Sequence, residues 1–403
     1  MSQSLDSSAT VEHLAARLPA DPPVDPHEPA IRQRLSTIRS EVTRVVTGLR
    51  WNGLSIAAAS QHLMALLDVG PVPQWQPVLI PLLVEIDRAG NLLPAWFHII
   101  QNSPDPVVAP RENPADSTQG RVRRIALLML GNYKQPQLAR QNEAGSYFWQ
   151  GASSEDITAC TLVDLLGTLA TDAASSLYAV QSLLKLDTNA ARQALLKALN
   201  AAQGWARVDV IEGIIHLNQP HFHDLLLASG LEHAPALESY VTSSLYRAIP
   251  LATYLQAETP PHLAQQAARV LAQVLRQSMT PPTPAVASQS SLPIVFERDL
   301  AVLAHALFAD AQARPTWQNT MALHTLGMLL GRYWEEISRG TIQDQRITES
   351  VYACLPMMPE VEQWMATQGR ATLYQALEQS EQGVHPPIVE TLEELREHEF
   401  VEH

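Results

Sequence analysis

The side chains best suited to bind a metal ion are four histidines in one stretch of the chain: His216, His221, His223 and His233. Zinc ligands on a helix usually stand three or four residues apart, so that they share a face. Only Glu212 and His216 have that spacing, because His221 and His223 stand two residues apart. A metal site would therefore need the fold to bring His216, His221 and His223 together. The alternative is surface histidines on turns, and we expect no bound metal or other cofactor.

A second group of polar side chains stands just before the histidines. Arg207, Asp209 and Glu212 occupy one predicted helix. They can form a polar patch that faces a binding partner. They can also form hydrogen bonds between neighbouring helix pairs, with the arginine joining one pair to the next. The sequence favours the structural interpretation, and the three residues are the candidates for partner binding.

Sequence motifs for catalysis are missing. The chain contains no phosphate-binding loop, glycine-rich dinucleotide turn, His-Glu-x-x-His motif, nucleophile elbow or Cys-x-x-Cys pair. We therefore expect no catalytic residues and a non-enzymatic function. The alternative is an enzyme built on a helical scaffold, with a histidine and carboxylate site near residues 212–233.

These candidate residues belong to a run of short amphipathic helices, predicted over 189–203, 205–218, 220–230 and 235–250. Apolar residues recur there every three or four positions, which indicates one buried face on each helix. Asp187 or Thr188 can cap the first helix. Gly204 and Asn218 tolerate positive φ and can end helices. Antiparallel pairs of such helices stack into an α-solenoid.

Part of this run resembles a known repeat. The segment Gly204-Trp205-Ala206-Arg207-Val208-Asp209-Val210-Ile211-Glu212 is similar to a consensus of bacterial HEAT-repeat proteins of unknown function, and Pro220, the leucines 225–227 and Gly230 fit it as well. Ala206 stands where a second glycine is common, and the histidines near 221 are unusual. The resemblance covers roughly a sixth of the chain. It implies an armadillo-like α-solenoid that serves as an interaction scaffold for a protein or peptide; a few such folds are enzymes.

The remaining sequence predicts an all-α chain whose C-terminal part is more compact than a solenoid. Two long helices are expected, over 294–313 and 315–337. The second is apolar on most sides and needs neighbours on several faces. The predicted segments are a leader (1–29), an N-terminal helical segment (30–101), a loop (102–120), a HEAT-like repeat region (121–279), a loop (280–293), a C-terminal helical segment (294–380) and an acidic tail (381–403).

The most regular helix is expected over residues 31–49. Its apolar residues alternate steps of four and three, as in a coiled-coil seam: Ile31, Leu35, Ile38, Val42, Val45 and Leu49. The seam is shorter than an established coiled coil requires. It can pack on neighbouring helices of the same chain, or it can form a homodimer.

Charge and composition limit the partners. The 403 residues include 27 basic and 41 acidic side chains, for a formal net charge of −14. Such a chain repels phosphate backbones and anionic lipid, so we expect neither general nucleic-acid binding nor membrane binding. No apolar run could span a bilayer, and no signal peptide is evident. We therefore expect a cytoplasmic protein in which Cys160 and Cys354 are buried, reduced thiols.

Overall fold

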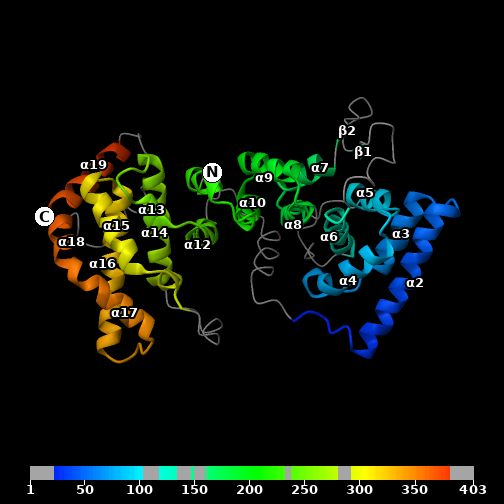
Figure 1. The fold of residues 1–403 in the computed structure, drawn as a ribbon, viewed down its shortest axis with the longest axis horizontal. Helices are drawn as coiled ribbons and strands as arrows, with labels where there is room; N and C mark the ends of the chain where they lie inside the picture. Colours follow the sequence, from blue (N-terminus) through cyan, green and yellow to red (C-terminus); the bar gives the residue numbers. More distant parts are fainter. Residues whose placement is uncertain are drawn as a thin grey trace. The chain divides into compact units, whose positions relative to one another are not determined.

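The computed structural model describes residues 22–102, 118–133, 147–148, 159–160, 162–231, 237–279 and 292–381. Contacts within the chain define two compact units. Unit 1 comprises Met1–Asn218 and His233–Leu237, and unit 2 comprises Gln219–Glu232 and Glu238–His403. Helices make up most of the described chain (Figure 1), which confirms the all-α prediction. None of the described helices has the length and apolar character that a bilayer crossing requires.

Unit 1 is built from helices α2 to α10, with one short strand pair. The elements are α2 (Pro29–Trp51), α3 (Ile56–Leu66), α4 (Val72–Ile86), α5 (Leu93–Asn102), α6 (Thr118–Leu130), β1 (Tyr147–Phe148), β2 (Ala159–Cys160), α7 (Leu162–Leu169), α8 (Ser176–Leu186), α9 (Asn189–Ala201) and α10 (Gly204–His216). The two strands are antiparallel, with Tyr147 opposite Cys160.

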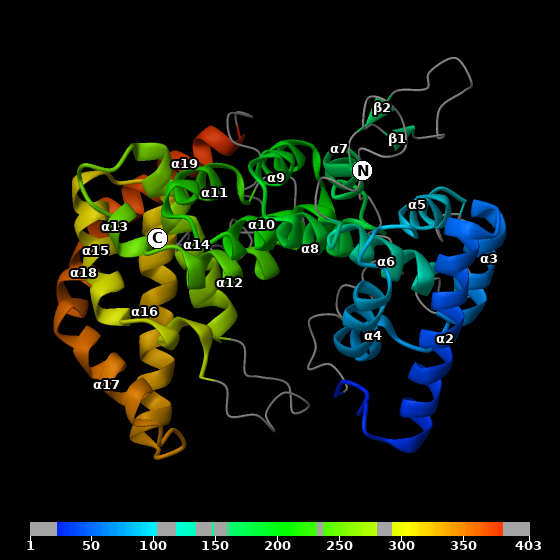
Figure 2. The ribbon, with the colours of Figure 1, turned by 45° about the vertical axis from the view of Figure 1, so that its right-hand side comes forward.

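The helices of unit 1 follow a regular contact pattern. Helices α2, α4, α6, α8 and α10 form one series in which each member packs on the next. On the other side, α3 packs on α5, and α7 packs on α9. Consecutive helices α5 and α6, α7 and α8, and α9 and α10 also contact each other. Figure 2 shows α7 and α9 on the same side of α8 and α10.

Small residues allow close approach within this series. A Cβ atom on Gly131, which follows α6, would lie 2.7 Å from Cα of Ser182 in α8. A Cβ atom on Gly213 in α10 would come closer than 3.0 Å to Val180 of α8. Ser182 Oγ donates a hydrogen bond of 2.6 Å to the backbone carbonyl of Leu127 in α6. Helix α8 is therefore held tightly against both α6 and α10.

The apolar seam of α2 is covered by the same chain. Ile38, Val42 and Val45 are buried, and α2 packs on α3 and α4. Packing of this helix on its neighbours is thereby confirmed. The central part of the seam offers no exposed strip to a second copy.

The helix ends in the central stretch follow local sequence chemistry. The Thr188 side chain accepts a hydrogen bond of 3.1 Å from the backbone N–H of Ala191 and caps α9. Gly204 has φ +55° at the start of α10, and Asn218 has φ +48° just beyond its end. The predicted cap and both predicted left-handed residues are confirmed.

Unit 2 contains the remaining elements, which are η4 (Pro220–Phe222), α11 (His223–Ser229), α12 (Glu238–Ala248), α13 (Leu251–Tyr254), α14 (Pro261–Met279), η5 (Ile294–Glu297), α15 (Leu300–Ala313), α16 (Trp317–Ser338), α17 (Gln345–Cys354), η6 (Leu355–Met357), α18 (Met358–Trp364), η7 (Met365–Gly369) and α19 (Arg370–Glu381). Helix α16 packs on α14, α15, α17 and α19. The expectation that this apolar helix has neighbours on several faces is confirmed. Cys354 is buried, and burial raises the pKa of its thiol to about 11.

Two expectations need correction or restriction. A single long helix over 294–313 is wrong, because η5 ends at Glu297 and Asp299 has extended backbone and caps α15 by accepting from the Val302 amide at 3.1 Å. The run of helices predicted over 189–250 is divided between the two units, since α9 and α10 belong to unit 1 and α11 and α12 to unit 2. The predicted leader, loops and acidic tail lie mainly outside the described residues.

Candidate functional site

Arg207 and Asp209 lie inside unit 1, not on its surface. The two residues are 1% and 2% exposed. Ser176 Oγ, at the start of α8, donates a hydrogen bond of 2.5 Å to Oδ2 of Asp209. An aspartate and a serine thereby join α10 to α8, two helices that are consecutive in the same series. This placement fits the structural interpretation, in which the polar residues tie neighbouring helix pairs together.

Glu212 differs from the other two candidates because its side chain is partly exposed. It lies one turn further along α10, and its backbone carbonyl is 2.9 Å from Nδ1 of His216. Of the three candidates for partner binding, only Glu212 reaches solvent, and its neighbour His216 is exposed as well. Partner binding by Arg207, Asp209 and Glu212 stays a prediction.

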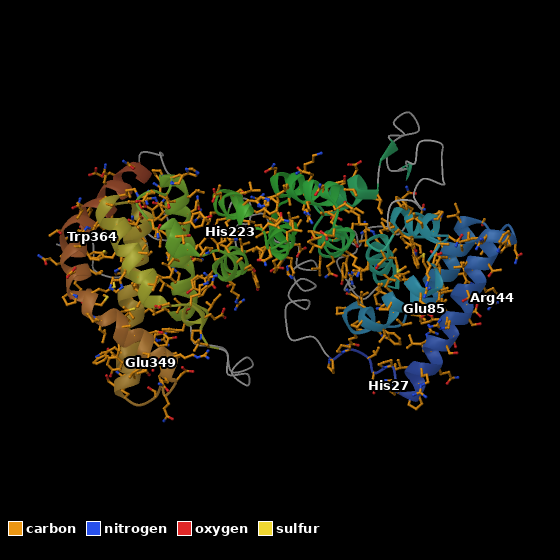
Figure 3. All side chains as sticks on the ribbon, viewed as in Figure 1. His27, Arg44, Glu85, His223, Glu349 and Trp364 are labelled. Carbon is orange, nitrogen blue, oxygen red and sulfur yellow. The ribbon has the colours of Figure 1, made fainter. Side chains whose placement is uncertain are left out.

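The histidines have separate surroundings. His216 is exposed on α10 of unit 1, whereas His221 and His223 belong to η4 and α11 of unit 2. The His221 ring packs on Phe222 with 4.0 Å between centroids. His223, labelled in Figure 3, is half-buried, and burial lowers its pKa, with Asp224 opposing and Arg298 adding to that shift. His233 lies outside the described residues.

The described histidines do not form a metal site. Within the described ranges, no group of three or more His, Cys, Asp or Glu side chains could hold a metal ion. His216, His221 and His223 are therefore not assembled into a site by the described part of the chain.

A polar cluster near His223 was not expected from the sequence. Tyr254 OH, at the end of α13, donates a hydrogen bond of 2.7 Å to Asp224 Oδ1. The pKa of Tyr254 is raised, first by burial and then by this aspartate. A tyrosine in this state keeps its proton at neutral pH and serves as a hydrogen-bond donor. The cluster thus has the chemistry of a structural contact between α11 and α13.

Charged residues connect α12 to the segment before α15. Arg247 makes a two-bond ion pair with Glu297, with both N···O distances 2.8 Å. The Arg298 guanidinium lies 5.6 Å from the centroid of the Tyr246 ring. Burial raises the pKa of Tyr246, whose hydroxyl donates to the Val295 carbonyl at 2.8 Å. These pairs join residues about fifty positions apart, which sequence spacing gives no means to predict.

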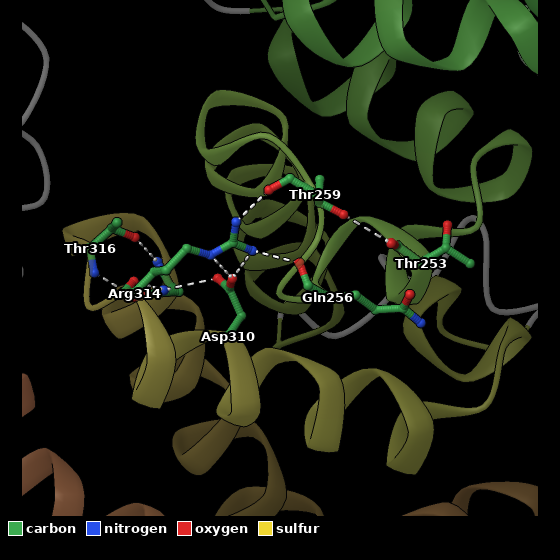
Figure 4. A network of polar contacts seen from close by, with 7 residues as sticks. Thr253, Gln256, Thr259, Asp310, Arg314 and Thr316 are labelled. Carbon is green, nitrogen blue, oxygen red and sulfur yellow. Dashed lines mark hydrogen bonds and ion pairs between the residues drawn. The ribbon is translucent and has the colours of Figure 1, made fainter.

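The best-connected buried network in unit 2 surrounds Asp310 (Figure 4). Asp310 is buried and accepts hydrogen bonds from the Arg314 guanidinium and from Asn319 Nδ2, the latter at 3.0 Å. Arg314 also donates to the backbone carbonyls of Thr259 and Gln256. The network ties the turn before α14 to the turn between α15 and α16. Every interaction in it is internal, so it stabilises unit 2 and leaves no group aimed at a ligand.

Exposed aromatic side chains are the surface features most suited to binding a macromolecule. Trp51, the last residue of α2, is 71% exposed. In unit 2, Trp334 and Tyr352 are both exposed and pack edge to face with 5.4 Å between centroids. The spacing of apolar residues did not single out Trp51 or Tyr352, because a helical period shows which face is apolar and not which residues remain uncovered.

No protein-family model, curated protein or solved structure matches the chain. The repeat-like segment from Gly204 to Glu212 therefore remains a resemblance, and function has to be argued from the residues and contacts above.

Proposed function

We propose that this chain is a helical-repeat scaffold of the HEAT-like α-solenoid class that binds a protein or peptide partner. The observation that carries the proposal is the contact pattern of unit 1. In the series α2, α4, α6, α8 and α10, each helix before α10 packs on the next, and α5 and α6, α7 and α8, and α9 and α10 form consecutive pairs. Stacked pairs of this kind present long rows of side chains, which in solenoids serve as binding surfaces.

The burial and hydrogen bonds of the polar residues support a scaffold more than an enzyme. Arg207, Asp209 and Asp310 are buried, and Asp209 and Asp310 accept hydrogen bonds from other helices. Catalysis needs titratable groups that converge on a place that a substrate can reach. In the described part of the chain, the best-connected groups are instead satisfied internally. The location predicted from the sequence, the cytoplasm, is part of the same proposal.

The proposal is tested by isolating a partner and reconstituting the complex. The full-length protein is immobilised and used to capture interacting proteins, with an unrelated helical protein as the control. Each candidate is then purified, and its binding is measured by titration calorimetry. We expect saturable binding with a defined stoichiometry.

Two results together would contradict a scaffold. One is the failure of every purified candidate to bind. The other is steady turnover of a substrate that is lost when a polar residue outside the buried network, such as Glu212 or His223, is replaced by alanine. That pair of results would favour an enzyme built on the same helices.

A further inference from the structure

The turn between α2 and α3 exposes an unusual set of side chains. We call Arg50, Trp51, Leu54 and Ile56 the α2–α3 corner. Trp51 is 71% exposed and Ile56 is 44% exposed, although both stand on regular helices. The Arg50 guanidinium lies 4.7 Å from the centroid of the Trp51 ring. The corner therefore presents a large aromatic surface with a cation held over it.

The backbone of the corner is held by local hydrogen bonds. The N–H groups of Asn52 and Leu54 both donate to the Gly48 carbonyl, at 3.1 and 3.0 Å. Gly53 has φ +65°, which allows the chain to turn back toward α2. Ser55 caps α3 by accepting a hydrogen bond of 3.2 Å from the Ala58 amide. The backbone that carries the exposed side chains is thus fixed in advance, which lowers the entropy lost on binding.

The charge of the corner contrasts with that of the chain. Of the 41 acidic residues, none lies between Glu41 and Asp68. Arg44 is exposed and pairs with Glu41, one turn before it. Arg50 contacts no carboxylate among the described residues, and its guanidinium lies over the Trp51 ring. An exposed apolar surface with an uncompensated guanidinium is complementary to a ligand that is both apolar and acidic.

We propose that the α2–α3 corner docks an acidic peptide segment of a partner protein, one that carries large apolar side chains next to its carboxylates. This inference rests on the proposed scaffold function and specifies its partner. Apolar side chains of the segment cover Trp51 and Ile56, and a carboxylate binds Arg50. Tryptophan and arginine are the residues that most often dominate such interfaces.

Physical arguments disfavour two other occupants. An anionic lipid surface repels a chain of net charge −14, and the attraction of Arg50 alone is too weak to overcome that repulsion. A symmetric dimer through the corner would bring both Arg50 side chains into one interface, and the corner itself supplies no carboxylate to pair with them. A short acidic segment of a partner contacts the corner alone, where residues 42–67 include no acidic side chain, and its carboxylate can pair with Arg50.

The test uses random 16-residue peptides displayed on phage as the probe and the full-length protein as the bait. Peptides are selected on the wild-type protein and then compared on the variants Trp51→Ala and Arg50→Glu. Trp334→Ala is the matched control, because it removes an exposed tryptophan elsewhere. We expect enriched peptides to combine Asp or Glu with aromatic or aliphatic residues. Synthetic copies should bind Trp51→Ala and Arg50→Glu at least about tenfold more weakly and Trp334→Ala as tightly as wild type.

Several outcomes would overturn the inference. Enriched peptides that bind Trp51→Ala as tightly as wild type would place the site elsewhere and leave the scaffold function standing. Enrichment of basic peptides, or no enrichment of any peptide, would refute the acidic partner. The reconstitution experiment would then decide separately whether the scaffold function also fails. Trp51-dependent sedimentation with phosphatidylserine vesicles, or Trp51-dependent dimerisation, would assign the corner to lipid or to a second copy. Unchanged melting temperatures show that the variants fold.

Discussion

Replacement of Asp310 by alanine provides a sharp test of how unit 2 is held together. The Asp310 carboxylate is buried, and its ion-pair partner Arg314 stands four residues later on the same stretch. Asn319 donates to its other oxygen at 3.0 Å. The Asp310→Ala variant leaves the Arg314 guanidinium with only the carbonyls of Thr259 and Gln256 and removes one acceptor of Asn319.

The size of the effect follows from burial. Removal of one partner from a buried ion pair destabilises a protein by about 3–5 kcal/mol. Arg314 keeps two carbonyl acceptors and its side chain is 21% exposed, so the lower end, about 3 kcal/mol, is expected. For a unit of this size, each kcal/mol lowers the melting temperature by about 2–4 °C. Unfolding of unit 2 should therefore shift down by about 6–12 °C.

A pair with the same spacing supplies the control. Glu335 and Arg339 are also four residues apart and lie 2.8 Å from each other, but their side chains are 63% and 69% exposed. Loss of such a surface pair costs about 0.3–0.5 kcal/mol. Differential scanning calorimetry and urea unfolding of Asp310→Ala and Glu335→Ala measure both effects. Equal losses of stability in the two variants would refute the argument from burial.

Three further predictions concern unit 1. Arg207→Ala should lower the free energy of unfolding by about 3 kcal/mol. An unchanged melting temperature together with lost partner binding would instead assign Arg207 to partner binding. Gly213→Ala should lower the free energy of unfolding by about 1–2 kcal/mol, because the added methyl group meets Val180. In a double-mutant cycle, Val180→Ala should reduce this loss. If the effects of the two substitutions simply add, the close contact is refuted. Burial raises the pKa of Asp87 above its ordinary 3.8, against hydrogen bonds from Leu92, Tyr133 and Asn91 that lower it. The folded chain thus holds this proton more tightly, so Asp87 contributes stability at low pH that is lost as pH rises through the raised pKa. Urea unfolding of wild type and Asp87→Asn between pH 4 and 7 measures this contribution. A difference in unfolding free energy between the two proteins that does not vary with pH would contradict the prediction.

Features set by neighbouring residues were predictable from the sequence. Thr188 caps its helix because a threonine side chain can reach an amide three residues on. Gly204 adopts positive φ because it has no Cβ atom to clash, and Asn218 does so because asparagine tolerates the left-handed region better than most residues. Asp299 shows the limit of this reasoning. It also follows a local rule, but the apolar residues on both sides of it masked the break between η5 and α15.

Contacts between distant residues were not predictable in the same way. Asp224 meets Tyr254, and Arg247 meets Glu297, only because α11, α12 and α13 are folded against their neighbours. The sequence placed Arg207, Asp209 and Glu212 on one helix, but it left open which of them face the protein interior. Burial of the first two was decided by the packing of α10 on α8 and α9.

The sequence by itself determined the all-α class, most of the helices and some of their caps, because propensity, capping and apolar spacing act over a few residues. Only the tertiary structure decided that Arg207 and Asp209 are internal, that the seam of α2 is covered by its own chain, and that Trp51 stays exposed. The reason is physical. The apolar period of a helix states that one face must be covered, whereas the identity of the covering element depends on contacts between residues far apart in the chain.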